Sequence, residues 1–150
     1  MLQFNEKMRQ MAGMRVYIDT NILIYFFNKD PKYLSLVSSF LQQCADRKIL
    51  GTVSQLVVAE VLVLPYRDKN LEAVAQLKAF FGQKDFLHVS EHGAGFMEES
   101  AMLAGERGLK LMDAMHWHAA VTNQCDFFVT NDLGFKSAGT VEVVQLAEFV

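Results

Sequence analysis

The stretch Val16-Tyr17-Ile18-Asp19-Thr20-Asn21 predicts how this chain begins to fold. Its first three residues are apolar and favour a strand, and an acidic residue follows them directly. We therefore expect a short buried strand over residues 15–18 and a helical turn or two over residues 21–27. Asp19 lies between the two, either as the cap of that helix or as a functional carboxylate held at the end of a strand.

Helical and extended patterns alternate along the rest of the chain. Apolar residues at helical spacing predict helices over residues 32–47, 55–64, 70–81, 91–107 and 113–123. Pro65 should end the second of these, and Gly108 should cap the fourth. Short apolar runs predict strands over residues 49–53, 85–89, 126–130 and 140–144, with a short helix over residues 133–137. Strands separated by helices favour a three-layer α/β/α sandwich with a central, mainly parallel sheet of about five strands.

The composition is that of a single globular domain spanning residues 1–150. Of the 150 residues, 51% are hydrophobic and 21% are charged, which excludes a disordered chain. No apolar run is long enough to cross a bilayer, and residues 1–13 lack the apolar region of a signal peptide. Met14 is an alternative start, so residues 1–13 are either an N-terminal extension or a partner-facing segment.

The net charge and the cysteines limit the classes of function and the compartment. A net charge of −3 argues against a protein that binds duplex nucleic acid through its overall charge, although it leaves room for a local basic patch. Cys44 and Cys125 are far apart and lie in apolar surroundings. We therefore expect them to be reduced core residues of a cytoplasmic protein that does not contact a membrane.

Four acidic residues lie where apolar segments begin or end. Asp19 and Asp132 each follow a predicted strand, while Glu60 lies in the apolar run 56–64 and Asp113 opens a helix. Carboxylates in apolar surroundings are costly unless they are protonated, paired or bound to a metal. Ligands of open α/β sheets bind at the carboxyl ends of the strands. The four acids could therefore line an oxygen-rich pocket for a hard divalent cation.

Each of these acids also has a purely structural explanation. Asp19 and Asp132 could cap the helices that follow them. Asp113 lies at a helix start, where the macrodipole favours an acid. Glu60 could lie on the one exposed stripe of its helix, although the apolar residues around it suggest a helix that is buried on nearly all sides.

Polar and cationic neighbours add to the candidate site. The residues placed to hydrogen-bond a neighbouring carboxylate and so orient it are Thr20, Asn21 and Thr130. Three cations lie near the acid-bearing segments and are candidates for binding a substrate. They are Arg67, Lys110 and Lys136. Each of these cations is also explained as an ordinary solvated side chain.

Other chemistries are not supported by the sequence. His116 and His118 do not face each other on a helix, and no third histidine or cysteine has ligand spacing, so zinc is not expected. We interpret both as surface or core residues, although His116 shares a helix face with Asp113. The chain has no nucleotide-binding glycine motif and no GxSxG motif. A phosphorylated receiver domain is disfavoured, because the third strand ends in Ser90-Glu91 rather than in a phospho-acceptor.

The order of these motifs resembles the PIN domain, and more closely the VapC-type toxins of bacterial and archaeal toxin–antitoxin pairs. The motifs are Ile-Asp-Thr-Asn at 18–21, Ala-Glu at 59–60, Asp-Ala at 113–114 and Thr-Asn-Asp at 130–132. The resemblance spans residues 14–150. Residues 115–118 are bulkier than the small or apolar residues that usually follow the third acid, which bears on substrate preference and not on the metal site.

The resemblance implies a Mg²⁺- or Mn²⁺-dependent endoribonuclease that hydrolyses RNA phosphodiester bonds. The positions that match the family's catalytic and metal-binding acids are Asp19, Glu60, Asp113 and Asp132. The resemblance also implies a cognate antitoxin protein and a homodimer. Two other classes stay open: a metal-dependent phosphatase of small phosphate esters, and a catalytically idle PIN fold that serves as a binding module.

Overall fold

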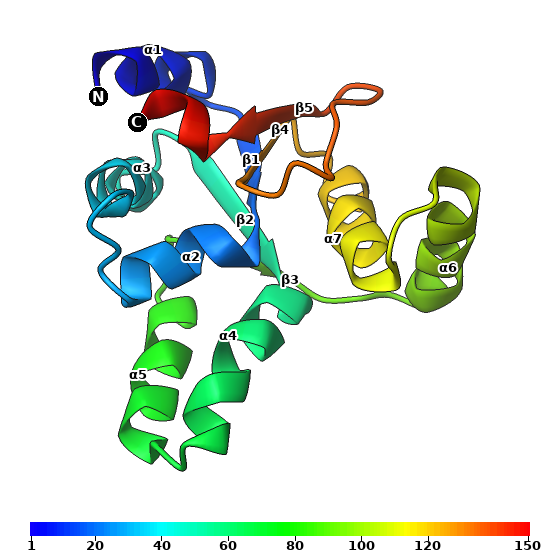
Figure 1. Ribbon diagram of the computed structural model, residues 1–150, viewed down its shortest axis with the longest axis horizontal. Coiled ribbons are helices and arrows are strands. Elements are labelled where there is room, and N and C mark those ends of the chain that lie inside the picture. Colours follow the sequence, from blue (N-terminus) through cyan, green and yellow to red (C-terminus); the bar gives the residue numbers. More distant parts are fainter.

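The computed structural model describes residues 1–150 and builds them around one parallel sheet (Figure 1). The strands are β1 (Arg15–Ile18), β2 (Leu50–Ser54), β3 (His88–Ser90), β4 (Phe127–Thr130) and β5 (Glu142–Gln145). The sheet order is β3-β2-β1-β4-β5, and all neighbouring strands are parallel. β1 is therefore central, and the carboxyl ends of all the strands meet at one edge of the sheet.

Helices cover both faces of this sheet. They are α1 (Leu2–Gln10), α2 (Thr20–Phe27), α3 (Leu34–Ala45), α4 (Gln55–Arg67), α5 (Leu71–Phe81), α6 (Phe96–Arg107), α7 (Leu111–Thr122) and the 3-10 helix η1 (Leu146–Phe149). In Figure 1, α2 and α3 lie on one side of the sheet, α6 and α7 lie on the other, and α4 and α5 extend as a pair beyond the carboxyl edge. This arrangement confirms the predicted three-layer sandwich. None of the helices has the length and apolar character of a membrane span.

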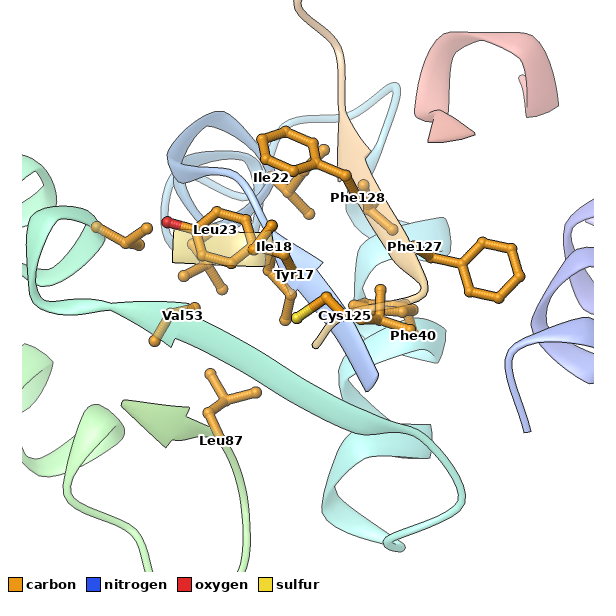
Figure 2. Close-up of a cluster of buried hydrophobic side chains, with 14 of the residues drawn as sticks. Tyr17, Ile18, Ile22, Leu23, Phe40, Val53, Leu87, Cys125, Phe127 and Phe128 are labelled. Carbon is orange, nitrogen blue, oxygen red and sulfur yellow. The ribbon is translucent and has the colours of Figure 1, made fainter. Parts of the chain in front are cut away.

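The central strands are buried on both faces, which explains why their sequences are apolar without alternation (Figure 2). Tyr17 of β1 and Phe128 of β4 are fully buried, and their rings stack with centroids 5.1 Å apart. Ile18, the last residue of β1, is fully buried as well. β1 is therefore held along both edges by its pairing with β2 and β4, and on both faces by packed side chains. Asp19 follows directly after this fixed strand.

The helix α4 does not stop at Pro65, so that prediction was wrong. It continues to Arg67, and Pro65 lies in its last turn. The backbone beyond the proline still closes the helix, because the Asp68 N–H donates to the Leu64 carbonyl and the Asn70 N–H donates to the Pro65 carbonyl, both at 2.9 Å. A single missing N–H near the end of a helix is tolerated when the following donors satisfy the last carbonyls.

Two other predicted helical segments are not helical. Residues 91–95 precede α6, which begins only at Phe96, and Gly95 has a φ of +81° that a continuous helix does not allow. Residues 133–134 form a turn and residues 135–137 have no regular structure, so the predicted short helix is absent. Asp132 caps this turn, because its Oδ1 accepts a hydrogen bond from the Gly134 N–H at 2.8 Å. Gly108 ends α6 in the left-handed region, as predicted.

Residues 1–13 contain α1, which packs near the amino edge of the sheet. Phe4, Met8 and Met11 are buried in the main core. The Phe4 ring lies 5.3 Å from that of Phe149, so both ends of the chain meet there, as Figure 1 shows. Lys7 forms an ion pair with Glu142 of β5. The amphipathic segment before β1 is thus part of the packed structure.

Replacing Phe4 by alanine should lower the free energy of unfolding by about 3 kcal/mol, because a fully buried ring is lost and the neighbouring side chains refill the space only in part. Urea unfolding followed by circular dichroism measures this change. Leu2→Ala is the matched control, since Leu2 lies on the same helix and is 84% exposed. Equal unfolding midpoints for the two variants would show that α1 does not contribute to the core.

Candidate active site

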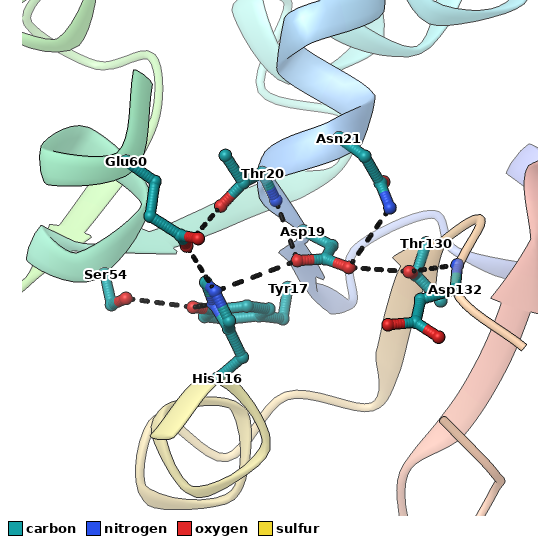
Figure 3. A network of polar contacts seen from close by, with 9 residues as sticks. All are labelled: Tyr17, Asp19, Thr20, Asn21, Ser54, Glu60, His116, Thr130 and Asp132. Carbon is teal, nitrogen blue, oxygen red and sulfur yellow. Dashed lines mark hydrogen bonds and ion pairs between the residues drawn. The ribbon is translucent and has the colours of Figure 1, made fainter. Parts of the chain in front are cut away.

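Asp19 lies at the carboxyl end of β1 and is only 6% exposed. Its Oδ1 accepts from the Thr20 backbone N–H at 2.8 Å, and its Oδ2 accepts from the Thr130 hydroxyl at 2.6 Å (Figure 3). Burial raises the pKa of Asp19, while the charge of His116 and the hydrogen bonds from Thr130 and Thr20 oppose the shift. Asp19 therefore caps α2, as its structural explanation required, and also presents a fixed carboxylate at the edge of the sheet.

Glu60 of α4 reaches the same edge of the sheet and lies on the side of Asp19 away from Thr130 (Figure 3). Its Oε1 accepts from the Thr20 hydroxyl at 2.8 Å and from His116 Nε2 at 2.6 Å. Burial alone would raise the pKa of Glu60. The hydrogen bond and charge of His116, together with the hydrogen bond from Thr20, outweigh burial and lower the pKa. Glu60 is therefore an ionised acceptor at neutral pH.

His116 of α7 lies at the centre of this network and is 4% exposed. Its Nδ1 lies 2.8 Å from the Tyr17 hydroxyl, which in turn lies 2.9 Å from the Ser54 hydroxyl. Its Nε2 also lies 3.9 Å from Asp19 Oδ1. Because an ionised carboxylate only accepts hydrogen bonds, Nε2 carries the hydrogen that it shares with Glu60.

The network joins five elements of the fold. Ser54 ends β2, Tyr17 belongs to β1, His116 to α7, Glu60 to α4 and Thr20 to α2. Ser54 is the N-cap residue of α4, but its hydroxyl bonds to Tyr17 rather than to the helix backbone. Burial raises the pKa of Tyr17 far above its ordinary range, so this phenol stays protonated and can link its two neighbours.

The sequence interpretation of the two histidines missed this contact. His116, which the sequence indicates as a surface or core residue, is buried and is also the partner of the predicted site residue Glu60. The available signal was its position three residues after Asp113, which places it on the same face of α7. His118 does lie apart from the site, where its Nε2 contacts Glu99 Oε2 at 2.7 Å.

Asp113 and Asp132 approach the same edge from α7 and from the turn after β4. Burial, followed by the charge of Asp132, raises the pKa of Asp113, and the charges of His116 and Lys110 oppose this shift. Thr130 connects Asp132 to Asp19, because its Oγ1 accepts from the Asp132 N–H at 2.9 Å and donates to Asp19 Oδ2. The effect of Asp132 on the pKa of Asp113 shows that the negative charges of these two aspartates are close enough to repel each other.

The donor chemistry of this edge fits a hard divalent cation. Carboxylate and amide oxygens are the ligands that Mg²⁺ and Mn²⁺ prefer. Asn21 Oδ1 is buried next to Asp19 and accepts no hydrogen bond, so it has a free lone pair for a cation or its water. As the side chains stand, however, no group of three histidine, cysteine, aspartate or glutamate residues converges on one point. Glu60 is turned toward His116 instead.

The cations proposed from the sequence are spread around this edge. Lys110 is the residue before α7 and lies within electrostatic reach of Asp113. Lys136 follows Asp132 in the turn after β4 and lines a separate hollow. Arg67 ends α4 and lies about two helical turns beyond Glu60. Lys110 thus acts electrostatically on an acid of the site, whereas Arg67 lies at the far end of α4.

An apolar groove of about 490 Å³ opens beside Glu60, between α2, α4 and α5. Phe26, Phe27 and Leu64 line it, together with Glu60. The outward face of α4 is more exposed than its sequence suggested, since Val57 and Val61 are the only buried residues of this helix. Leu64 is 56% exposed, so apolar surface continues from the groove to the outside of the protein.

Comparisons with known proteins agree with this fold. The family model described as the PIN domain matches residues 16–141. None of the curated proteins compared with the chain matches it. VapBC2 from Rickettsia felis, solved with a DNA fragment from its promoter, superposes with a TM-score of 0.67 at 21% identity, covering 88% of this chain and 98% of that one.

Two further solved structures share the architecture. DNA-bound VapBC from Salmonella typhimurium gives a TM-score of 0.61 at 17% identity, covering 89% of this chain and 98% of that one. VapC20 from Mycobacterium tuberculosis, described as a sarcin-ricin loop cleaving toxin, gives 0.59 at 16% identity, covering 75% of this chain and 86% of that one. At these identities the likeness shows the fold.

Proposed function

Because the chain belongs to the PIN domain family, we propose that it is a divalent-metal-dependent endoribonuclease that hydrolyses RNA phosphodiester bonds. The observation that supports this proposal is the pair of carboxylates Asp19 and Glu60, which both contact Thr20 and His116 at one edge of the sheet, with Asp113 and Asp132 on neighbouring segments. These are the four acids that would hold the ion.

The bound Mg²⁺ or Mn²⁺ would supply an acidified water and offset the negative charge that develops on the phosphodiester. The side chains prepare the site for this chemistry. Asp19 is held in one orientation by Thr20 and Thr130, so it needs no rearrangement to bind. Glu60, whose pKa is lowered, is ionised at neutral pH and would hold the ion or its bound water.

The biological role that we propose is the toxin of a type II toxin–antitoxin pair in the cytoplasm. Two of the structural relatives are complexes named VapBC, and the third is named as a sarcin-ricin loop cleaving toxin. The partner would be a cognate antitoxin whose apolar segment occupies the groove between α2, α4 and α5. This groove includes Glu60, so its occupant would also cover one of the acids. The expected homodimer is part of the same proposal, and light scattering tests it.

Incubating the purified protein with end-labelled RNA and Mn²⁺ should produce defined fragments, and EDTA should abolish the cleavage. The ion should also stabilise the folded protein by about 2.7 kcal/mol at a concentration one hundred times its dissociation constant. Gel electrophoresis follows the fragments, and thermal unfolding with and without Mn²⁺ follows binding.

A small phosphomonoester serves as the competing substrate. Hydrolysis of the ester without RNA cleavage would replace the nuclease by a phosphatase. A protein that Mn²⁺ stabilises but that cuts neither substrate would be a binding module. Cleavage that persists in EDTA would remove the metal from the proposal.

A further inference from the structure

A hollow of about 320 Å³ lies beside α7, between the C-terminal end of α6 and the turn that follows β4. Its apolar lining includes the buried rings of Trp117 and Phe135. Arg107 and Lys136 line it from opposite segments and are both exposed. The hollow therefore combines an aromatic lining with two cations.

The charges of this hollow are not neutralised by the protein. Neither Arg107 nor Lys136 takes part in any of the ion pairs of the chain. None of the lining residues is an acid. The guanidinium carbon of Arg107 lies 5.9 Å from the centre of the Trp117 ring, close enough for a cation–π contact that holds this side chain over the lining. Two positive charges with no counter-charge favour an anionic ligand.

The two walls of the hollow belong to segments of the chain that also carry acids of the candidate active site. Lys136 lies four residues after Asp132, and Arg107 lies six residues before Asp113. The turn that carries Lys136 is fixed at both ends. Gln145 Nε2 donates to the Asp132 carbonyl at 2.8 Å, and the Val143 N–H donates to the Ser137 hydroxyl at 2.9 Å. A ligand in the hollow would therefore be held in a defined position relative to the acids.

We propose that this hollow binds a phosphate of the RNA strand on one side of the phosphodiester that is cut. This inference rests on the proposed ribonuclease function and gives it a substrate subsite. Arginine and lysine next to an aromatic surface are the side chains that hold single-stranded nucleic acid, since the cations contact the backbone and the apolar surface contacts sugar or base. The subsite also explains how a protein with a net charge of −3 grips an anionic strand.

The test uses RNA binding by the Asp19→Asn protein, in which cleavage is disabled. Changing Arg107 and Lys136 together to glutamine should weaken the binding of a short single-stranded RNA about tenfold. It should also reduce the slope of log affinity against log salt by about 0.7, the contribution of one phosphate contact on a single strand. Fluorescence anisotropy of a labelled RNA measures both quantities.

The matched control changes Arg9 and Lys48 to glutamine. These two cations line a different hollow beside α1, so the control removes the same charge from a surface remote from the acids. The control should leave the affinity and the salt slope unchanged. Equal losses in both double variants would overturn the subsite, because only the overall charge would then matter.

Trp117 provides a direct readout, because it is the single tryptophan of the chain. Its fluorescence should change when the RNA binds and should change less in the Arg107→Gln, Lys136→Gln protein. RNA binding with no tryptophan response and no effect of the double variant would overturn the subsite and leave the proposed function standing. An equal response to inorganic phosphate at the same concentration would also overturn it, by showing a free-anion site. A wild-type protein that cuts no RNA contradicts the proposed function itself.

Discussion

Replacing Asp19 by asparagine should reduce RNA cleavage by at least about a thousandfold while the protein stays folded. The change keeps the size of the side chain and one acceptor oxygen but removes the negative charge at the centre of the acid cluster. A loss of several kcal/mol in the stabilisation of the transition state by the metal corresponds to this factor in the rate. Single-turnover cleavage of labelled RNA in Mn²⁺ measures it. Activity within tenfold of the wild type would exclude Asp19 as a metal ligand.

In EDTA, where no divalent ion is bound, Asp19→Asn should also change how the free energy of unfolding depends on pH. Burial raises the pKa of Asp19, so between the ordinary aspartate value of about 3.9 and that raised pKa the folded state binds more protons than the unfolded state. Wild-type stability attributable to Asp19 therefore falls as the pH rises through this window. The asparagine of the variant does not titrate. The stability of the variant minus that of the wild type should thus increase with pH and then stay constant.

Replacing His116 by alanine should lower the free energy of unfolding by about 3 kcal/mol and the rate of cleavage by about a hundredfold. The buried Tyr17 hydroxyl loses one of its two partners, and Glu60 loses the contact that lowers its pKa. Glu60 would then be held by the Thr20 hydroxyl alone, and a displacement of about 1 Å costs a factor of this size. Denaturant unfolding and cleavage assays measure the two effects.

Two further variants separate orientation from packing. His116→Gln keeps a donor toward Glu60 and should recover part of the cleavage rate. His118→Ala is the matched control on the same helix, because its partner Glu99 lies on the surface. A similar loss of cleavage in the two alanine variants would show that α7 responds to any histidine change. The orientation of Glu60 by His116 would then be excluded.

The position of Asp19 followed from a local sequence pattern, because it comes directly after strand residues that are buried. Asp19 follows directly after the strand residues 16–18, and parallel strands bring their carboxyl ends to one edge. His116 could not be assigned in this way. Its role depends on Tyr17 and Ser54, which lie 99 and 62 residues away along the chain, and pairing over such separations has no local signature.

The differences in secondary structure have similar causes. Pro65 usually ends a helix, but here the chain reverses just after Arg67, so the following backbone N–H groups satisfy the last carbonyls. The helix α1 was not predicted because it lacks a side-chain cap and has no acid in its first turn. It forms because Phe4 and Met8 are buried against the rest of the core. Tertiary contacts decide the outcome in both segments.

In the proposed metal site, the hydrogen bond between His116 and Glu60 would also set a condition on the ion that binds. Glu60 Oε1 already has two donors, so a cation that takes over this oxygen must replace contacts that exist before it arrives. A hydrogen bond to a charged group contributes about 1.5–3 kcal/mol, which is equivalent to a factor of about ten to one hundred in affinity. A monovalent ion would bind Glu60 too weakly to replace these hydrogen bonds. A divalent ion that binds both Glu60 and Asp19 would replace them.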